Sequence, residues 1–207
     1  MYMKNFIVNS YINHIKKYNN YSEEKLEKIE YGLTGLYLTF SKMIIIFLIA
    51  IILGIFKETL IFMILFNILR TTAFGIHASK SWICLLSSLI SFIGIPLLAM
   101  HLNINLYLKI VLCILNVILF FMNAPADTHK KPIINKKRRF LFKIITTITS
   151  IVYSILCILI NNNFISNSLL LTMVLENIFI SPLTYKTFNM PYNNYINYLK
   201  LHPDIIN

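Results

Sequence analysis

The sequence has few charged residues for its length. Only 13% of its 207 residues are Asp, Glu, Lys or Arg, whereas a soluble domain carries about 25%. Apolar residues make up 57%, above the roughly 45–50% of soluble domains. This composition excludes an ordinary soluble domain and predicts a membrane protein. At this length we expect one membrane-embedded domain over residues 1–207, with no separate soluble domain.

Acidic residues are scarcer still, with 8 against 19 basic residues and a net charge of +11. In a soluble protein this excess would suggest nucleic acid as a partner. In a membrane protein it marks the cytoplasmic loops, so we expect a lipid bilayer and no nucleic acid as the partner. Cysteines are few as well. Their odd count of 3, with two inside apolar runs, argues against a disulfide framework.

Several short motifs are missing. The N-terminus lacks the short apolar core and small-residue cleavage site of a signal peptide, so we expect no cleavable leader. There is no His-Glu-x-x-His pair, and the histidines outside residues 69–88 share no metal-ligand spacing, so we expect no metal site. A Gly-rich phosphate loop is absent too, and no cofactor is expected.

Long apolar runs fill most of the chain, and most reach the roughly 20 residues that a bilayer-spanning helix needs. They lie at residues 36–56, 59–73, 82–100, 104–124, 140–160 and 164–181. The second is short, because only TLIFMILFNIL precedes Arg70. A helix of that length covers about 16 Å, so we expect it to end within the membrane, where irregular chain must be surrounded by protein or line a wet cavity. The predicted fold is an all-α polytopic bundle of about six spans.

The ends of the chain are more polar. Residues 2–20 repeat apolar positions at helical spacing among lysines and asparagines, which predicts a basic amphipathic helix on the membrane surface. Ser22 is a candidate N-cap for the next helix. We expect amphipathic interfacial helices over 1–35, the transmembrane bundle over 36–184 and a cytoplasmic tail over 185–207.

Basic residues predict the orientation. With the N-terminus inside and six spans, 17 of the 19 basic residues fall on the cytoplasmic side. Only Lys57 and Lys109 remain outside, and the outer loop 161–163 is neutral. We therefore expect a multi-pass protein of the cell membrane, with both termini and the polar stretch 69–88 on the cytoplasmic side.

That stretch, LRTTAFGIHASKSWICLLSS, interrupts the apolar runs with reactive side chains. His77 and Cys84 are seven residues apart, which on one continuous helix places them on one face but about 10.5 Å apart along the axis. A thiol and an imidazole must approach within about 3 Å to exchange a proton. The pair can therefore act together only if the helix is interrupted between them.

The residues for such an interruption are present. Gly75 permits a turn, and Ser79 or Ser81 can cap a new helix. With Ser81 as the cap, Cys84 lies at the third helical position, where free N–H groups and the helix dipole stabilise a thiolate or a developing oxyanion. His77 would fold back from the preceding loop as general base. The plainer alternative is an inert thiol and a solvated imidazole.

Four residues of this stretch form a spaced pattern: Arg70, Gly75, His77 and Cys84. The pattern resembles the signature of the AgrB family (accessory gene regulator protein B), which are membrane cysteine endopeptidases of Gram-positive bacteria. The stretch NAPADTHKKPI, residues 123–133, resembles a second family motif, Ala-Pro-x-Asp followed by a basic run. Length, six spans and the amphipathic N-terminus agree, so the resemblance covers nearly the whole chain. In one departure, Phe74-Gly75 stands where the family usually has two glycines.

The resemblance implies a peptidase that processes the AgrD-like precursor of a quorum-sensing pheromone in a bacterial cell membrane. Cys84 would attack a backbone carbonyl of the precursor, release its C-terminal tail and retain the rest as a thioester. His77 would accept the thiol proton and later protonate the leaving amine. A Cys or Ser of the peptide would then displace Cys84 and close a thiolactone or lactone ring. The resemblance also implies a homodimer.

The basic run HKKPIINKKRR, residues 129–139, has two interpretations. A positive loop beside anionic lipid is a sufficient explanation. The sharper hypothesis is that its cations also attract an acidic C-terminal tail of the precursor. The residues concerned are Lys136, Lys137, Arg138 and Arg139. Arg70 is costly at membrane depth unless paired or functional; it could pair with a substrate carboxylate or with Asp127, and Asp127 could instead orient His77.

The remaining candidates have plain explanations beside functional ones. Glu176 is an intramembrane acid, and so either a site residue or an interhelical hydrogen-bond partner. Cys113 and Cys157 are expected to be core packing. The rival function is a small transporter or peptide export channel without covalent catalysis, with Arg70, Glu176 and Asp127 as a polar pathway. A further alternative is a peptidase-like scaffold without a reactive thiol.

Overall fold

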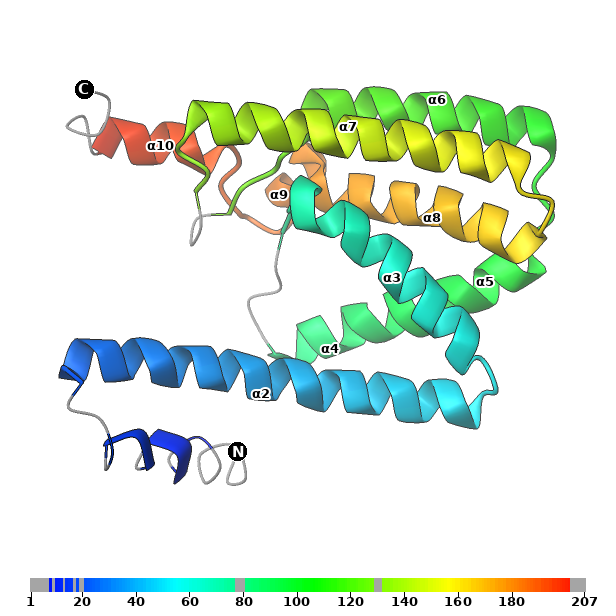
Figure 1. Cartoon of the computed structure of the whole chain (residues 1–207). Coiled ribbons are helices and arrows are strands. Elements are labelled where there is room, and N and C mark those ends of the chain that lie inside the picture. Colours follow the sequence, from blue (N-terminus) through cyan, green and yellow to red (C-terminus); the bar gives the residue numbers. More distant parts are fainter. Residues whose placement is uncertain are drawn as a thin grey trace. The chain divides into compact units, whose positions relative to one another are not determined.

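The computed structural model describes residues 8, 10–12, 14–16, 18, 21–76, 81–128 and 132–201 (Figure 1). Over these residues the chain is helical apart from short connections and one isolated β-bridge, and no strand occurs among them. The all-α prediction is therefore confirmed. The chain divides into two compact units, Met1–Ile52 and Leu53–Asn207.

The first unit contains α2 (Glu23–Ile52), which begins directly after Ser22, the predicted cap. In the amphipathic stretch before it, every described residue from 8 to 18 is helical, as the apolar spacing predicts. Val8 and Ile12 are buried there. By contrast, only 11% of the apolar window of α2 is buried. A helix that is apolar on all sides and little buried is typical of a membrane span.

The second unit holds the other helices. In chain order they are α3 (Phe56–Ala73), α4 (Ser81–Leu89), the π-helix η1 (Ile90–Gly94), α5 (Ile95–His101), α6 (Leu106–Asn123), α7 (Lys136–Leu159), α8 (Asn163–Ile180), α9 (Pro182–Thr187) and α10 (Asn194–Leu201). The side chains of Asn105, Asn135 and Asn162 accept N–H groups at the starts of α6, α7 and α8, because an N-cap satisfies donors that lack a partner within the helix. Each of the six predicted apolar segments coincides with a helix or a run of helices.

Among the described residues, five helical stretches are long and apolar enough to cross a membrane, so the protein is multi-pass. They are α2, the continuous run Ser81–His101, α6, α7 and α8. The sixth helix, α3, ends at Ala73, where the predicted segment 59–73 ends, but it begins earlier, at Phe56. Its 18 residues give a length of about 27 Å, longer than the roughly 16 Å expected from the apolar run before Arg70. Arg70, near its end, pairs with Glu176 on α8.

α8 is the central helix of the second unit, packed against α3, α5, α6 and α7 (Figure 1). It is 56% buried, and its mean hydropathy of 1.3 is the lowest among the five spans. The reason is a set of buried polar side chains: Ser166, Asn167, Ser168, Thr172, Glu176 and Asn177. Such groups are stable within a membrane when they bond between helices. Asn177, for example, donates to the side-chain oxygen of Asn116 on α6 at 2.7 Å.

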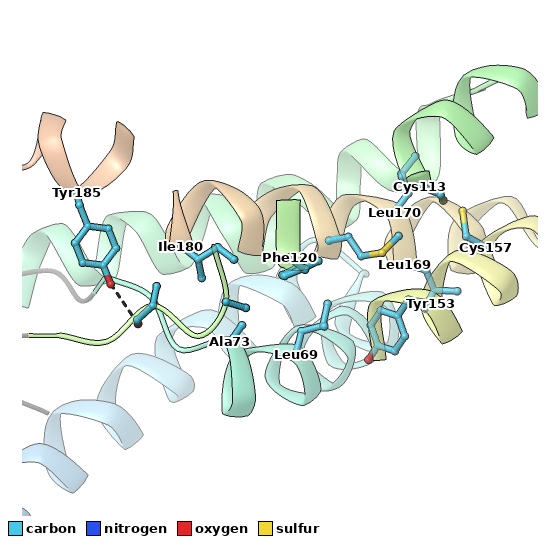
Figure 2. Packing of buried hydrophobic residues seen from close by; sticks show 13 residues of the cluster. Leu69, Ala73, Cys113, Phe120, Tyr153, Cys157, Leu169, Leu170, Ile180 and Tyr185 are labelled. Atoms are coloured by element: carbon cyan, nitrogen blue, oxygen red, sulfur yellow. Dashed lines mark hydrogen bonds between the residues drawn. The ribbon is translucent and has the colours of Figure 1, made fainter. Parts of the chain in front are cut away.

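The hydrophobic core of this unit follows α8 from Cys113 and Cys157 at one end to Tyr185 at the other (Figure 2). Both cysteines are free and buried, as expected for core packing. At the Tyr185 end the core includes Ala124 and Ala126, which belong to the connection between α6 and α7. The chain leaving α3 meets the same end of the core, which fixes the position of the candidate site.

Candidate functional site

The predicted helix interruption is present near Gly75. α3 ends at Ala73 and α4 begins at Ser81, and residues 74–76 are not helical. Phe74 and Gly75 have positive φ angles of 63° and 98°, which turn the chain away from the axis of α3. Two consecutive residues thus adopt a conformation that glycine favours. They occupy the positions where the resemblance places a pair of glycines.

Backbone hydrogen bonds hold this turn against two other parts of the chain. The Gly75 N–H donates to the carbonyl oxygen of Ala126 (2.8 Å), and the Ala126 N–H donates to that of Ala73 (2.9 Å). The Ile76 N–H donates to the carbonyl oxygen of Phe179 on α8 (3.1 Å). The turn and the Ala-Pro-x-Asp stretch therefore form an isolated parallel β-bridge. Two motifs that are far apart in sequence are in direct contact.

Space as well as conformation requires glycine at position 75. A Cβ atom there would lie 2.6 Å from Nη1 of Arg70 and 2.9 Å from the carbonyl oxygen of Phe179. The carbonyl belongs to the backbone of α8, and the guanidinium is held by an ion pair. Neither neighbour can therefore move without breaking other contacts.

Arg70 lies beside the turn, with 17% of its side chain exposed. Its Nη1 is 3.3 Å from both carboxylate oxygens of Glu176, which is fully buried. Its Nη2 donates to the carbonyl oxygen of Ile76, the residue before His77. Of the two partners considered for Arg70, Asp127 is not the one that it contacts, because α3 packs against α8 and brings Glu176 to the guanidinium. Pairing with a substrate carboxylate stays a prediction. The pairing with Glu176 explains how a charge is tolerated at this depth.

Asp127 is 1% exposed and bonds to the C-terminal segment. Its carboxylate accepts backbone N–H groups, among them those of Asn194 (3.1 Å) and Tyr195 (2.9 Å) at the start of α10. Arg139 lies 3.6 Å away through Nη1. These contacts supply the partners that a buried carboxylate needs. The role of Asp127 in orienting His77 stays a prediction, since residues 77–80 lie outside the described residues.

Tyr185 of α9 is a site residue that sequence reasoning missed. Its hydroxyl donates to the carbonyl oxygens of Ala126 (3.3 Å) and Asp127 (3.0 Å), and Figure 2 draws the first of these bonds dashed. Burial raises the pKa of Tyr185, so the hydroxyl keeps the proton that it donates. A tyrosine in a polar C-terminal tail has no sequence signal that distinguishes it from its neighbours.

Cys84 is a half-buried free thiol in the first turn of α4. Cys84 is the fourth residue of α4 as described (Ser81–Leu89). The role of Ser81 as the cap stays a prediction, since residue 80 lies outside the described residues. Among the described residues, no hydrogen bond joins the Cys84 side chain to Arg70 or Asp127. Its expected partner His77 lies outside the described residues, as does Ser79.

The four cations proposed for substrate binding form the first turn of α7, and they are not equivalent. Lys136, Lys137 and Arg138 are exposed. Arg139 pairs with Asp127, and its guanidinium lies 3.8 Å from the centre of the Tyr195 ring. Arg139 therefore joins α7 to α10. Within the part of the chain that the structure describes, no three His, Cys, Asp or Glu side chains gather closely enough to hold a metal ion.

Comparison with known proteins identifies the family of the chain. A family profile described as Accessory gene regulator B matches residues 8–180. This chain belongs to the AgrB family. The AgrB-family match ends at the last residue of α8, so α9 and α10 lie beyond it. No solved structure matches the chain.

Individual AgrB proteins are similar over most of their length. A protein of Clostridium acetobutylicum described as AgrB-like is 31% identical over 174 residues, covering 84% of this chain and 83% of that protein. Accessory gene regulator protein B of Staphylococcus aureus strain MRSA252 is 35% identical over 148 residues, covering 70% and 79%. The protein of the same name from strain Newman is 31% identical over 151 residues, covering 72% and 80%.

Proposed function

We propose that this AgrB-family protein is a membrane cysteine endopeptidase that cleaves an AgrD-type pheromone precursor. The observation that carries the proposal is the interrupted helix. In a chain of this family, Cys84 lies in the first turn of α4, directly after the segment that contains His77. A helix start offers backbone N–H groups without intrahelical partners. These groups suit both a thiolate and the oxyanion of an acyl-transfer reaction.

The proposed reaction has two acyl transfers. The Cys84 thiolate attacks a backbone carbonyl of the precursor, and His77 takes up the thiol proton. The carbon–nitrogen bond then breaks, His77 protonates the leaving amine, and the C-terminal tail departs while the rest remains as a thioester on Cys84. A thiol or hydroxyl of the bound peptide displaces the enzyme thiolate and closes a thiolactone or lactone ring. No external energy source is needed for the thiolactone, because one thioester replaces another.

The anchored turn supports this assignment. Arg70, Ala126 and Phe179 bond to the two residues that precede His77. The chain therefore enters the segment 77–80 from a fixed point. A general base must be held within hydrogen-bond reach of its partner, and a fixed entry point reduces the positions available to the imidazole.

The distribution of basic residues bears on the orientation of the protein in the membrane and on how it attracts its substrate. The excess of basic residues favours a cytoplasmic location for both termini and for the catalytic pair. The exposed cations Lys136, Lys137 and Arg138 at the start of α7 would attract an acidic precursor tail. A transporter would instead use Arg70, Glu176 and Asp127 as its polar pathway. Since these three side chains are engaged in ion pairs within the protein, we favour the peptidase.

Cleavage of a tagged precursor by full-length protein in lipid vesicles tests the proposal. Cys84→Ala and His77→Ala should abolish release of the C-terminal tail, while the inserted amount stays unchanged. Cys157→Ala is the matched control, because it removes a thiol that is 1% exposed. Wild-type protein should form a hydroxylamine-sensitive peptide adduct that Cys84→Ala lacks. Continued cleavage by Cys84→Ala would favour the transporter or scaffold alternative.

A further inference from the structure

The C-terminal segment 181–201 is bonded to the α6–α7 connection through Asp127. Asn194 and Tyr195 carry the first backbone N–H groups of α10, which have no acceptor within that helix. The Asp127 carboxylate accepts both, at 3.1 and 2.9 Å. It thereby caps α10 from a distant part of the chain, at the helix end where the dipole favours negative charge. Arg139, 3.6 Å away, compensates the charge.

One carbonyl oxygen joins this segment to the turn before His77. The oxygen of Ala126 accepts both the Gly75 N–H at 2.8 Å and the Tyr185 hydroxyl at 3.3 Å. Two donors can share it because a carbonyl oxygen has two lone pairs. The same Ala126 residue donates its N–H to Ala73 at the end of α3. The Tyr185 hydroxyl and the turn therefore bond to the same residue of one short loop.

We propose that the segment 181–201 is a positioning element for the turn at residues 74–76, directly before His77, acting through Tyr185 and Asp127. The inference rests on the proposed peptidase function, and the segment lies beyond the family match, which ends at residue 180. Two consecutive positive φ angles persist only where surrounding contacts hold them. Ala126 supplies part of those contacts, and Tyr185 and Asp127 in turn hold the loop that contains Ala126.

Tyr185→Phe tests the proposal by removing one oxygen atom. The variant loses both donated hydrogen bonds but keeps the ring, which packs 5.1 Å from the Tyr192 ring. In full-length protein in lipid vesicles, kcat for cleavage of a tagged AgrD-type precursor should fall roughly 2- to 10-fold, with KM unchanged. The matched control is Tyr107→Phe, on a side chain that is 84% exposed at the start of α6. It should leave both constants unchanged.

Alkylation of Cys84 by iodoacetamide separates positioning from folding. Cys113 and Cys157 are 2% and 1% exposed, and Cys84→Ala supplies the background rate. If the turn loosens, the imidazole of His77 pairs less often with the thiol. The pH of half-maximal alkylation should then rise in Tyr185→Phe. Unfolded molecules would instead also be labelled at Cys113 and Cys157, so more than one alkylated thiol per chain indicates a folding defect.

Asp127→Asn provides a second variant of nearly the same shape. It removes the charge that Arg139 compensates and weakens the cap of α10, so the alkylation profile should shift in the same direction. The positioning role is overturned if both variants cleave with the wild-type kcat. It is also overturned if kcat falls in both variants but the pH dependence of Cys84 alkylation stays the same. Cleavage by Cys84→Ala overturns the peptidase function itself. Loss of cleavage in Cys84→Ala with normal behaviour of both Tyr185→Phe and Asp127→Asn overturns only the present inference.

Discussion

Nη1 of Arg70 lies 3.3 Å from both carboxylate oxygens of Glu176, and Nη2 of the same guanidinium donates to the carbonyl oxygen of Ile76. One side chain thus joins the central helix α8 to the backbone directly before His77. A guanidinium can make both contacts because its donors are fixed in a planar fork, whereas the ammonium of lysine is a single compact charge. The pair therefore has a geometric role as well as an electrostatic one.

Arg70→Lys should separate these two roles. Lysine retains a positive charge for Glu176 but has no second fixed donor for the Ile76 oxygen. A hydrogen bond from a charged group contributes about 1.5–3 kcal/mol, so we expect precursor cleavage per inserted molecule to fall about 10- to 100-fold. Insertion into vesicles should be normal. Full cleavage activity in Arg70→Lys would show that the bond to Ile76 does not matter.

Glu176→Gln should instead act on stability. Removing one partner of a buried ion pair leaves the other charge without compensation, at a cost of about 3–5 kcal/mol. We expect a lower unfolding temperature in detergent. Glu30→Gln, at an exposed position of α2, is the matched control and should be neutral. If both variants unfold at the wild-type temperature, the ion pair is not a stabilising contact.

Gly75→Ala should be among the most damaging small substitutions in the chain. The added methyl group would meet the Arg70 guanidinium at 2.6 Å and a backbone oxygen at 2.9 Å, at a φ of +98°. We expect loss of precursor cleavage and a decrease in unfolding free energy of about 2 kcal/mol or more. Gly94→Ala is the comparison, because that glycine has open space around it. There alanine should stabilise by about 0.5–1 kcal/mol.

At position 74, glycine should give a more stable protein than alanine, the reverse of their usual order within a helix. The φ of +63° at Phe74 disfavours any residue with a Cβ atom, although the Phe74 ring packs 5.1 Å from that of Phe142. Phe74→Ala loses the ring contact and keeps the strain, whereas Phe74→Gly loses the contact and relieves the strain. We expect Phe74→Gly to be the more stable of the two by about 1 kcal/mol, measured by thermal unfolding. Equal stability would indicate that the turn is not strained.

The helices could be predicted because their causes are local. Apolar length determines the spans, Ser22 precedes α2, and a glycine at 75 marks the interruption. The partner of Arg70 could not be predicted, because Glu176 lies 106 residues further along the chain. Judged by charge alone, Asp127 was as plausible a partner for Arg70 as Glu176. The choice between the two acids depends on which helices pack together.

The candidate site was predictable in its residue types but not in its contacts. The motif around Gly75 and the Ala-Pro-x-Asp stretch were each recognisable, yet nothing in their spacing brings Gly75 to Ala126. That contact is made by backbone atoms, which carry no sequence signature. The same holds for Tyr185, since its hydroxyl bonds only to carbonyl oxygens.

Charge reversal at the start of α7 tests the attraction of an acidic precursor tail. Lys136→Glu with Lys137→Glu changes two exposed side chains and leaves Arg139 paired with Asp127. Acidic residues are favourable in the first turn of a helix, so the double variant should not lose stability. Exposed charge pairs contribute about 0.2–1 kcal/mol each, and we therefore expect KM for an acidic-tailed precursor to rise roughly 3- to 10-fold at unchanged kcat.

A precursor whose tail carboxylates are replaced by amides is the matched control for this charge reversal. Wild type and the Lys136→Glu, Lys137→Glu variant should cleave that neutral peptide with the same KM, because no charge remains to attract or repel. Raising the salt concentration should also reduce the difference on the acidic peptide, since exposed charges are screened over about 8 Å at physiological ionic strength. An equal rise in KM on both peptides would mean that the lysines act on the lipid surface or on the fold, and not on the tail.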